Sequence, residues 1–120
     1  MEEMYRYKAK VTRIVDGDTL DVIIDLGFSI SIKERLRLYG VNTPETRTRD
    51  KEEKKKGLAA KEFVRERVED SEVQIQTYKK GKFGRALCVI YYNNALKDDI
   101  NLNQELINEG HAVSYYGGRR

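Results

Sequence analysis

The first third of the chain alternates between apolar and polar residues with a period of two, which predicts β-strands. Residues 5–15, 19–27 and 29–40 each show this alternation. An Asp-Gly dipeptide separates the first two runs and is a strong hairpin signal. The pattern therefore predicts a three-stranded antiparallel meander. Its apolar face would carry Tyr5, Tyr7, Ala9, Val11, Val15, Leu20, Val22, Ile24, Leu26, Ile30, Ile32, Leu36 and Leu38.

The rest of the chain predicts two helices and two further strands. Residues 58–68 place apolar side chains at helical spacing, and residues 101–110 form a second, short amphipathic segment that ends in glycine. Residues 72–78 and 86–92 have the composition of strands, and residues 111–116 are expected to be extended. The charged segment 47–56 lacks periodic apolar residues and predicts a mobile surface loop.

Five strands with a helix after the third describe a β-rich α+β domain, a five-stranded Greek-key barrel of the OB type with two short helices. The length of 120 residues suits one domain, with a core from about residue 5 to residue 116 and a frayed tail at 117–120.

Charge is unevenly distributed, although the formal net charge is only +3. Residues 79–85 contain three lysines and one arginine without an acidic residue, and the chain ends in two arginines. Local basic patches of this kind favour a protein that binds phosphate groups at one site.

Cys88 and His111 are the only residues of their kinds. An intrachain disulfide, a cysteine zinc site and a Ser-His-Asp triad are therefore not expected. No segment resembles a signal peptide or approaches the roughly 20 apolar residues of a membrane span. We expect a monomer without a membrane partner, cytoplasmic unless a leader has been removed.

The stretch from residue 35 to 47, RLRLYGVNTPETR, crowds cations beside a carboxylate. Alternation places Arg37 on the polar face of the third strand, and Asp18 lies in the first hairpin. Antiparallel neighbours bring the start of one strand beside the end of the next. Asp18, Arg37, Asn42, Thr43 and Glu45 are therefore expected to converge at one end of the barrel.

These side chains suit phosphodiester chemistry. A carboxylate, an amide oxygen and a turn carbonyl are hard oxygen ligands of the kind Ca²⁺ prefers. Arg37 and Arg85 would hold a phosphodiester through bidentate hydrogen bonds. Glu45 is ionised near neutral pH and could orient or deprotonate a water molecule.

Three ordered motifs, VDGDT, RLRLYGVNTPET and KFGRALCVIYY, resemble the staphylococcal nuclease (thermonuclease) family from about Val11 to Tyr116. The resemblance implies an OB-fold, calcium-dependent endonuclease. Such an enzyme hydrolyses phosphodiester bonds of DNA and RNA with little sequence preference and leaves 3′-phosphate ends.

By this resemblance, Arg37, Glu45 and Arg85 match the catalytic residues. Asp18 matches the principal calcium carboxylate, and Thr43 the residue that supplies its backbone carbonyl. The resemblance also implies substrate-binding residues. Lys82 and Phe83 match a lysine-tyrosine pair that contacts nucleotide phosphate, although Phe83 lacks the tyrosine hydroxyl. Tyr116 or Tyr115 matches a tyrosine beside the nucleotide. The two tyrosines could equally be packing residues of the last extended segment.

Asn42 departs from the family pattern, because its best-known members have a second calcium-binding aspartate at this position. An amide oxygen can still bind Ca²⁺, but one negative charge is lost and weaker binding is expected. The alternative to an enzyme is a catalytically inactive OB-type nucleic-acid-binding module, which would bind single strands through a basic groove and aromatic side chains.

Overall fold

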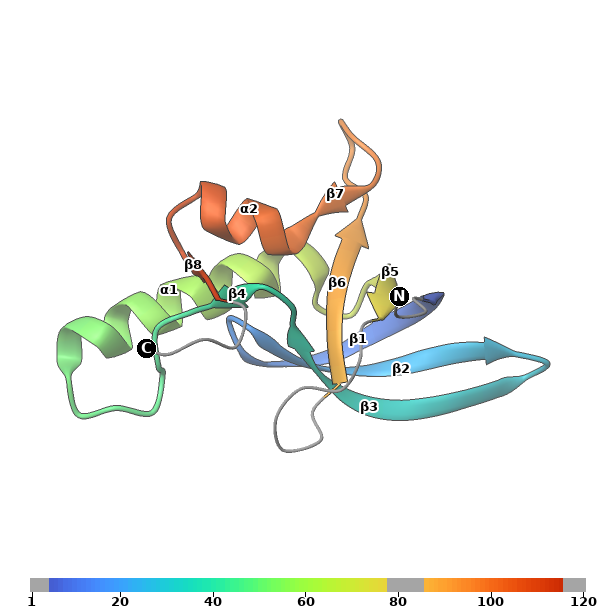
Figure 1. Ribbon diagram of the computed structural model, residues 1–120, viewed down its shortest axis with the longest axis horizontal. Coiled ribbons are helices and arrows are strands. Elements are labelled where there is room, and N and C mark those ends of the chain that lie inside the picture. The colour runs from blue at the N-terminus through green and yellow to red at the C-terminus, as the bar shows by residue number, and fades with distance from the viewer. Residues whose placement is uncertain (1–4, 78–85, 116–120) are drawn as a thin grey trace.

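The computed structural model describes residues 5–77 and 86–115. Within these ranges a mixed sheet closes into a five-stranded barrel, accompanied by two helices (Figure 1). The barrel strands are β1 (Arg6–Asp16), β2 (Thr19–Gly27), β3 (Ile30–Leu38), β5 (Glu72–Thr77) and β6 (Ala86–Tyr92). The remaining elements are β4 (Val41–Asn42), α1 (Lys51–Val68), β7 (Ile100–Asn101), α2 (Leu102–Asn108) and β8 (Val113–Ser114).

The barrel closes through a parallel pairing of β3 with β6, in which Leu36 lies beside Ala86 and Leu38 beside Cys88. The other barrel pairings are antiparallel, in the order β3-β2-β1-β5-β6. The predicted OB-type barrel is confirmed. The two-residue strands β4 and β7 were not predicted, because such short bridges leave no periodic signal, whereas β8 lies in the segment 111–116 that was predicted to be extended.

The barrel core is apolar and continuous. Its fully buried large side chains are Val11, Leu20, Val22, Leu36, Leu38, Val41, Val64, Val68, Ile75, Ile90, Leu102 and Leu106. Cys88 is buried among them, and burial raises the pKa of its thiol to about 12. The neutral thiol therefore packs as a small apolar group.

A β-bulge alters which residues of β1 face the core. The register with β2 shifts between Val11 and Arg13 and again between Ile14 and Asp16. An inserted residue reverses the alternation beyond it. As a result Ile14 is buried and Val15 only half-buried, so the predicted inward position of Val15 is wrong.

The outer ends of β2 and β3 extend beyond the rest of the barrel as a two-stranded ribbon (Figure 1). Leu26, Ile30 and Ile32 were predicted on the apolar face, yet each is exposed. The pairing of β1 with β2 reaches only Asp25, and β6 pairs with β3 only from Leu36 onward. No layer of the described residues covers the ribbon, so alternation continues there without burial.

Helix α1 begins at Lys51, so the predicted loop over residues 47–56 is wrong from that point on. Asp50 caps the helix, and its carboxylate accepts the backbone N–H groups of Glu52 and Glu53. Two glutamates in the first turn add favourable charge near the positive end of the helix dipole. The first six residues of the helix, 51–56, carry no apolar side chain, so capping and charge stabilise this part.

Helix α2 lies within the segment 101–110 that was predicted to be helical. Asn101 caps the helix, Leu102 and Leu106 are buried, and the helix ends before Gly110, which has a φ of 80°. Among the described helices none is long and apolar enough to cross a membrane.

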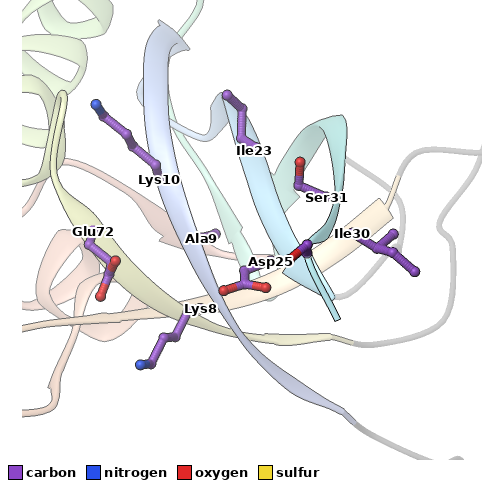
Figure 2. Close-up of a pocket in the computed structure, with 9 residues that line it drawn as sticks. Lys8, Ala9, Lys10, Ile23, Asp25, Ile30, Ser31 and Glu72 are labelled. Atoms are coloured by element: carbon purple, nitrogen blue, oxygen red, sulfur yellow. The ribbon is translucent and has the colours of Figure 1, made fainter. Parts of the chain in front are cut away.

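A shallow pocket opens on the outer face of the sheet, where Lys8 and Lys10 of β1 lie near Asp25 and Glu72 (Figure 2). Opposite charges are interspersed along its walls. Of the predicted site residues that the structure describes, none lines it.

Candidate functional site

The first hairpin and the end of β3 meet at one end of the barrel. Thr19, at the start of β2, lies opposite Arg37 on β3. The backbone N–H of Leu38 donates to the carbonyl oxygen of Asp18 over 2.9 Å. This antiparallel register places the Asp18 turn beside the chain that continues from β3 into β4.

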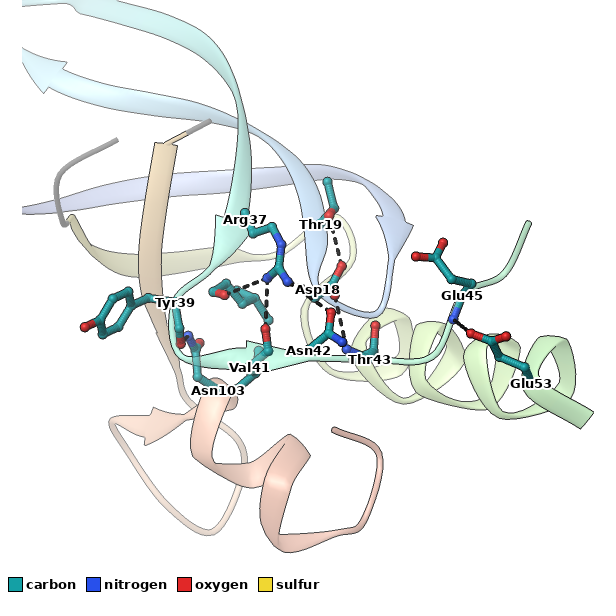
Figure 3. Close-up of polar contacts among 11 residues, drawn as sticks. Asp18, Thr19, Arg37, Tyr39, Val41, Asn42, Thr43, Glu45, Glu53 and Asn103 are labelled. Carbon is teal, nitrogen blue, oxygen red and sulfur yellow. Dashed lines mark hydrogen bonds and ion pairs between the residues drawn. The ribbon is translucent and has the colours of Figure 1, made fainter. Parts of the chain in front are cut away.

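The Asp18 carboxylate is fixed by two neighbouring groups. Its Oδ1 accepts the Thr19 hydroxyl over 3.0 Å, and its Oδ2 accepts the Thr43 backbone N–H over 3.1 Å. The side chain is only 12% exposed. Two turns that are distant in sequence are therefore joined through one carboxylate (Figure 3).

Arg37 points into this site and is held from several sides. Its Nη1 donates to the carbonyl oxygens of Leu38 at 3.1 Å and Val41 at 2.9 Å, while Nη2 donates to Asn42 Oδ1 at 3.2 Å. Nη2 also lies 3.6 Å from Asp18 Oδ2. The guanidinium plane is thus fixed by the protein, with its side chain 14% exposed.

Glu45 lies on the same turn but is exposed. Its backbone N–H donates to Glu53 Oε2 of helix α1 over 3.3 Å. In Figure 3 the Glu45 carboxylate lies on the side of the turn that faces Asp18, and the carboxylate of Glu53 points to the Glu45 amide. The next residue, Thr46, donates its hydroxyl to the Asp16 carboxylate, which ties this turn to the first hairpin.

Tyr115 borders the site. Its backbone N–H donates to the carbonyl oxygen of Gly40, and the Arg37 guanidinium carbon lies 5.9 Å from the centroid of its ring. Lys82, Phe83, Arg85 and Tyr116, also predicted as site residues, lie outside the described residues. Of the predicted set, the structure therefore brings together Asp18, Arg37, Asn42 and Thr43, with Glu45 and Tyr115 adjoining them.

The predicted calcium ligands fit a hard cation in chemical kind, because all are oxygen atoms. They contribute a single carboxylate, Asp18, and the Asn42 amide oxygen already accepts a hydrogen bond from Arg37. In the described parts of the chain, no three histidine, cysteine or carboxylate side chains gather at one point. The donor set is therefore suited to a weakly held Ca²⁺, because affinity rises with the number of charged ligands.

Three residues that support the site were not identified from sequence. Glu53 and Gly57 contact the Glu45 turn from helix α1. Asn103 is buried. Its side-chain oxygen accepts a hydrogen bond from the Ile90 N–H, and its side-chain nitrogen donates to the carbonyl oxygens of Tyr39 and Cys88. An Asp-x-x-Glu pattern at residues 50–53 was the available signal for an early start of α1.

Residues 35–120 match the family described as staphylococcal nuclease homologue. The chain belongs to the staphylococcal nuclease family. Among its curated relatives is an uncharacterized protein of Methanocaldococcus jannaschii. The two are 33% identical over an alignment 129 residues long, and this alignment covers 91% of this chain and 59% of the relative.

Several of the relatives are named as nucleases. The micrococcal nuclease of Shigella flexneri is 29% identical over 117 residues, covering 91% of this chain and 59% of that protein. The thermonuclease of Staphylococcus intermedius is 33% identical over 102 residues, covering 83% and 55% respectively. This staphylococcal nuclease domain thus spans little more than half the length of these relatives.

Proposed function

We propose that this domain is a calcium-dependent endonuclease that hydrolyses phosphodiester bonds of DNA and RNA with little sequence preference, leaving 3′-phosphate ends. The proposal is carried by the fixed Arg37 guanidinium beside the Asp18 carboxylate, with Glu45 on the adjoining turn. Membership of a nuclease family supports this interpretation.

Arg37 would bind the scissile phosphate with donors that need no reorganisation, because backbone carbonyls already hold its plane. Glu45 would orient a water molecule and accept its proton as the water oxygen bonds to phosphorus. The bond from phosphorus to the 5′-oxygen breaks, the 5′-oxygen takes a proton from solvent, and the phosphate stays on the 3′ side. Arg85, the second predicted clamp, would share the developing charge.

Asp18, Asn42 and the Thr43 carbonyl would hold Ca²⁺. When bound, the ion would supply electrostatic stabilisation of the negative charge that develops on phosphate.

Purified protein is expected to digest denatured DNA in the presence of Ca²⁺ and to lose this activity in excess chelator. The measurement is release of acid-soluble nucleotides over a calcium titration, followed by analysis of product ends for 3′-phosphate. A folded sample without activity at every calcium concentration would contradict the proposal.

The alternative, an inactive nucleic-acid-binding module, makes a different prediction for the same sample. It would retard labelled single strands in a gel without shortening them. Hydrolysis is favoured because a protein that only binds nucleic acid has no use for a carboxylate placed among phosphates. Arg37 lies near the end of β3, Glu45 lies on the turn that follows β4, and Arg85 is present in the sequence.

Asn42→Asp is expected to lower the calcium concentration that gives half-maximal rate. The substitution adds a carboxylate beside Asp18, and calcium affinity rises with ligand charge. The calcium dependence of the rate, measured at saturating DNA, checks this expectation. Asn42→Ser retains an uncharged oxygen and serves as the control, which should not lower that concentration. An unchanged or higher requirement in the aspartate variant would mean that residue 42 is not a ligand.

A further inference from the structure

Helix α1 approaches the Glu45 turn more closely than a side chain at Gly57 would allow. A Cβ added to Gly57 would lie 2.5 Å from the carbonyl oxygen of Glu45, 2.8 Å from its carbonyl carbon and 2.8 Å from the carbonyl oxygen of Pro44. These neighbours are backbone atoms, so they cannot swing away as the end of a flexible side chain would. Glycine is therefore required for this contact.

The same face of the helix also contacts the other peptide group of Glu45. Glu53 lies one turn before Gly57, so both residues lie on one side of α1. The Glu53 carboxylate accepts the Glu45 backbone N–H over 3.3 Å. Glu53 and Gly57 thus form one stripe along the helix. Glu53 holds the N–H of residue 45 through a hydrogen bond, and Gly57 packs closely against the C=O of residue 45.

The stripe continues to the first hairpin. Ala60 lies on the same face one turn after Gly57, and a Cβ added to Gly17 would lie 2.8 Å from the Ala60 Cβ and 3.0 Å from Thr43 Cγ2. The helix is therefore packed against the hairpin that carries Asp18 and against the turn that carries Glu45. Both parts of the candidate site share one rigid support.

We infer that Glu53 and Gly57 are positioning residues that set where the Glu45 carboxylate stands relative to Asp18 and Arg37. This inference rests on the proposed hydrolytic function of Glu45. A displacement of about 1 Å at a catalytic group can cost about a hundredfold in rate. Gly57→Ala displaces the backbone of residue 45 itself, whereas the hydrogen bonds that hold Arg37, the proposed phosphate ligand, go to Leu38, Val41 and Asn42.

The test is steady-state hydrolysis of denatured DNA by Gly57→Ala. We expect kcat to fall about a hundredfold, with KM little changed. Alanine favours a helix over glycine, so the change is not expected to unfold α1 by itself. Ala59→Gly is the control: it weakens helix propensity at an exposed position of the same helix and should keep the wild-type kcat.

A double-substitution cycle shows whether Gly57 acts through Glu45. In a Glu45→Gln background, the further change Gly57→Ala should cost little or nothing, because the displaced group is already inactive. Equal costs in both backgrounds would overturn the inference. So would wild-type kcat in the single Gly57→Ala variant.

A second measurement does not depend on activity and separates this inference from the proposed function. Glu53→Ala removes the acceptor of the Glu45 amide, whereas Glu53→Gln retains an oxygen there. By nuclear magnetic resonance, exchange of the Glu45 amide proton should become about fivefold faster in the alanine variant, as for the loss of one hydrogen bond. The glutamine variant should stay close to wild type.

If the wild-type protein does not cleave nucleic acid, the proposed function fails while the exchange data still decide whether α1 holds the turn. If Gly57→Ala does not fold, Glu53→Ala and Glu53→Gln are used instead, and both kcat and the exchange of the Glu45 amide proton are measured for these two variants. Unchanged exchange in Glu53→Ala would overturn the inference whatever the activity of the protein.

Discussion

Glu45→Gln is expected to reduce kcat for DNA hydrolysis by about 10²–10⁴-fold, the usual contribution of a general base. Glutamine has nearly the same size and keeps the backbone hydrogen bond to Glu53, but its side chain cannot accept a proton from water. KM should change little, because Glu45 is not proposed to bind the phosphate. Initial rates over a range of DNA concentrations separate the two parameters.

Glu66→Gln is the matched control for this experiment. Glu66 is exposed on α1 and undergoes the same loss of charge without belonging to the site. Its kcat should equal that of the wild type. If both variants retain full activity, the base is another group, and the assignment of Glu45 is wrong.

Arg37→Lys is expected to lower kcat by about 10²–10³-fold, the usual cost of removing a preorganised donor to a developing oxyanion. Lysine keeps the positive charge but lacks the planar fork of donors. Its donors all lie on one nitrogen, so they do not reproduce the separate Nη1 and Nη2 positions from which Arg37 reaches the Val41 carbonyl oxygen and Asn42. Hydrolysis rates at saturating calcium give the measurement.

The control for Arg37 lies two residues away on the same strand. Arg35 is exposed, and its Nε donates to the Asp21 carboxylate over 2.7 Å, which holds the pKa of Asp21 below its usual range. Arg35→Lys makes the same chemical change outside the site and should leave kcat within about twofold, as is usual for surface positions. Equal losses in the two variants would indicate a general effect of β3 rather than a role at the phosphate.

Much of the barrel follows from local pattern. The period-two alternation and the Asp-Gly turn place Asp18 in the hairpin that leads into β2 and Arg37 on the neighbouring strand β3, and antiparallel pairing then brings them to one end. The positions of Ile30 and Ile32 could not be predicted in the same way. Their alternation is intact, and their exposure depends on where β1 and β6 stop, which is a property of the whole sheet.

The supporting contacts of the site were harder to predict, for two physical reasons. Residues 51–56 carry only charge, so their helix is specified by the Asp50 cap rather than by an apolar stripe. The requirement for glycine at Gly57 arises from a peptide group twelve residues earlier, and no local rule encodes such an approach. The proposed roles of Asn42 in calcium binding and of Glu45 in catalysis stay predictions. The residue types and their positions are compatible with these roles but do not establish them.

The parallel seam between β3 and β6 also affects how the domain is made. While the chain is being synthesised, Asp18, Arg37 and Glu45 emerge early, but the partner of Leu36 is Ala86, which emerges much later. Until then β3 presents an open edge, and such edges invite pairing with other chains. A ribosome-bound or truncated product would thus carry Asp18, Arg37 and Glu45 on an aggregation-prone meander until β6, the last strand of the barrel, pairs with β3.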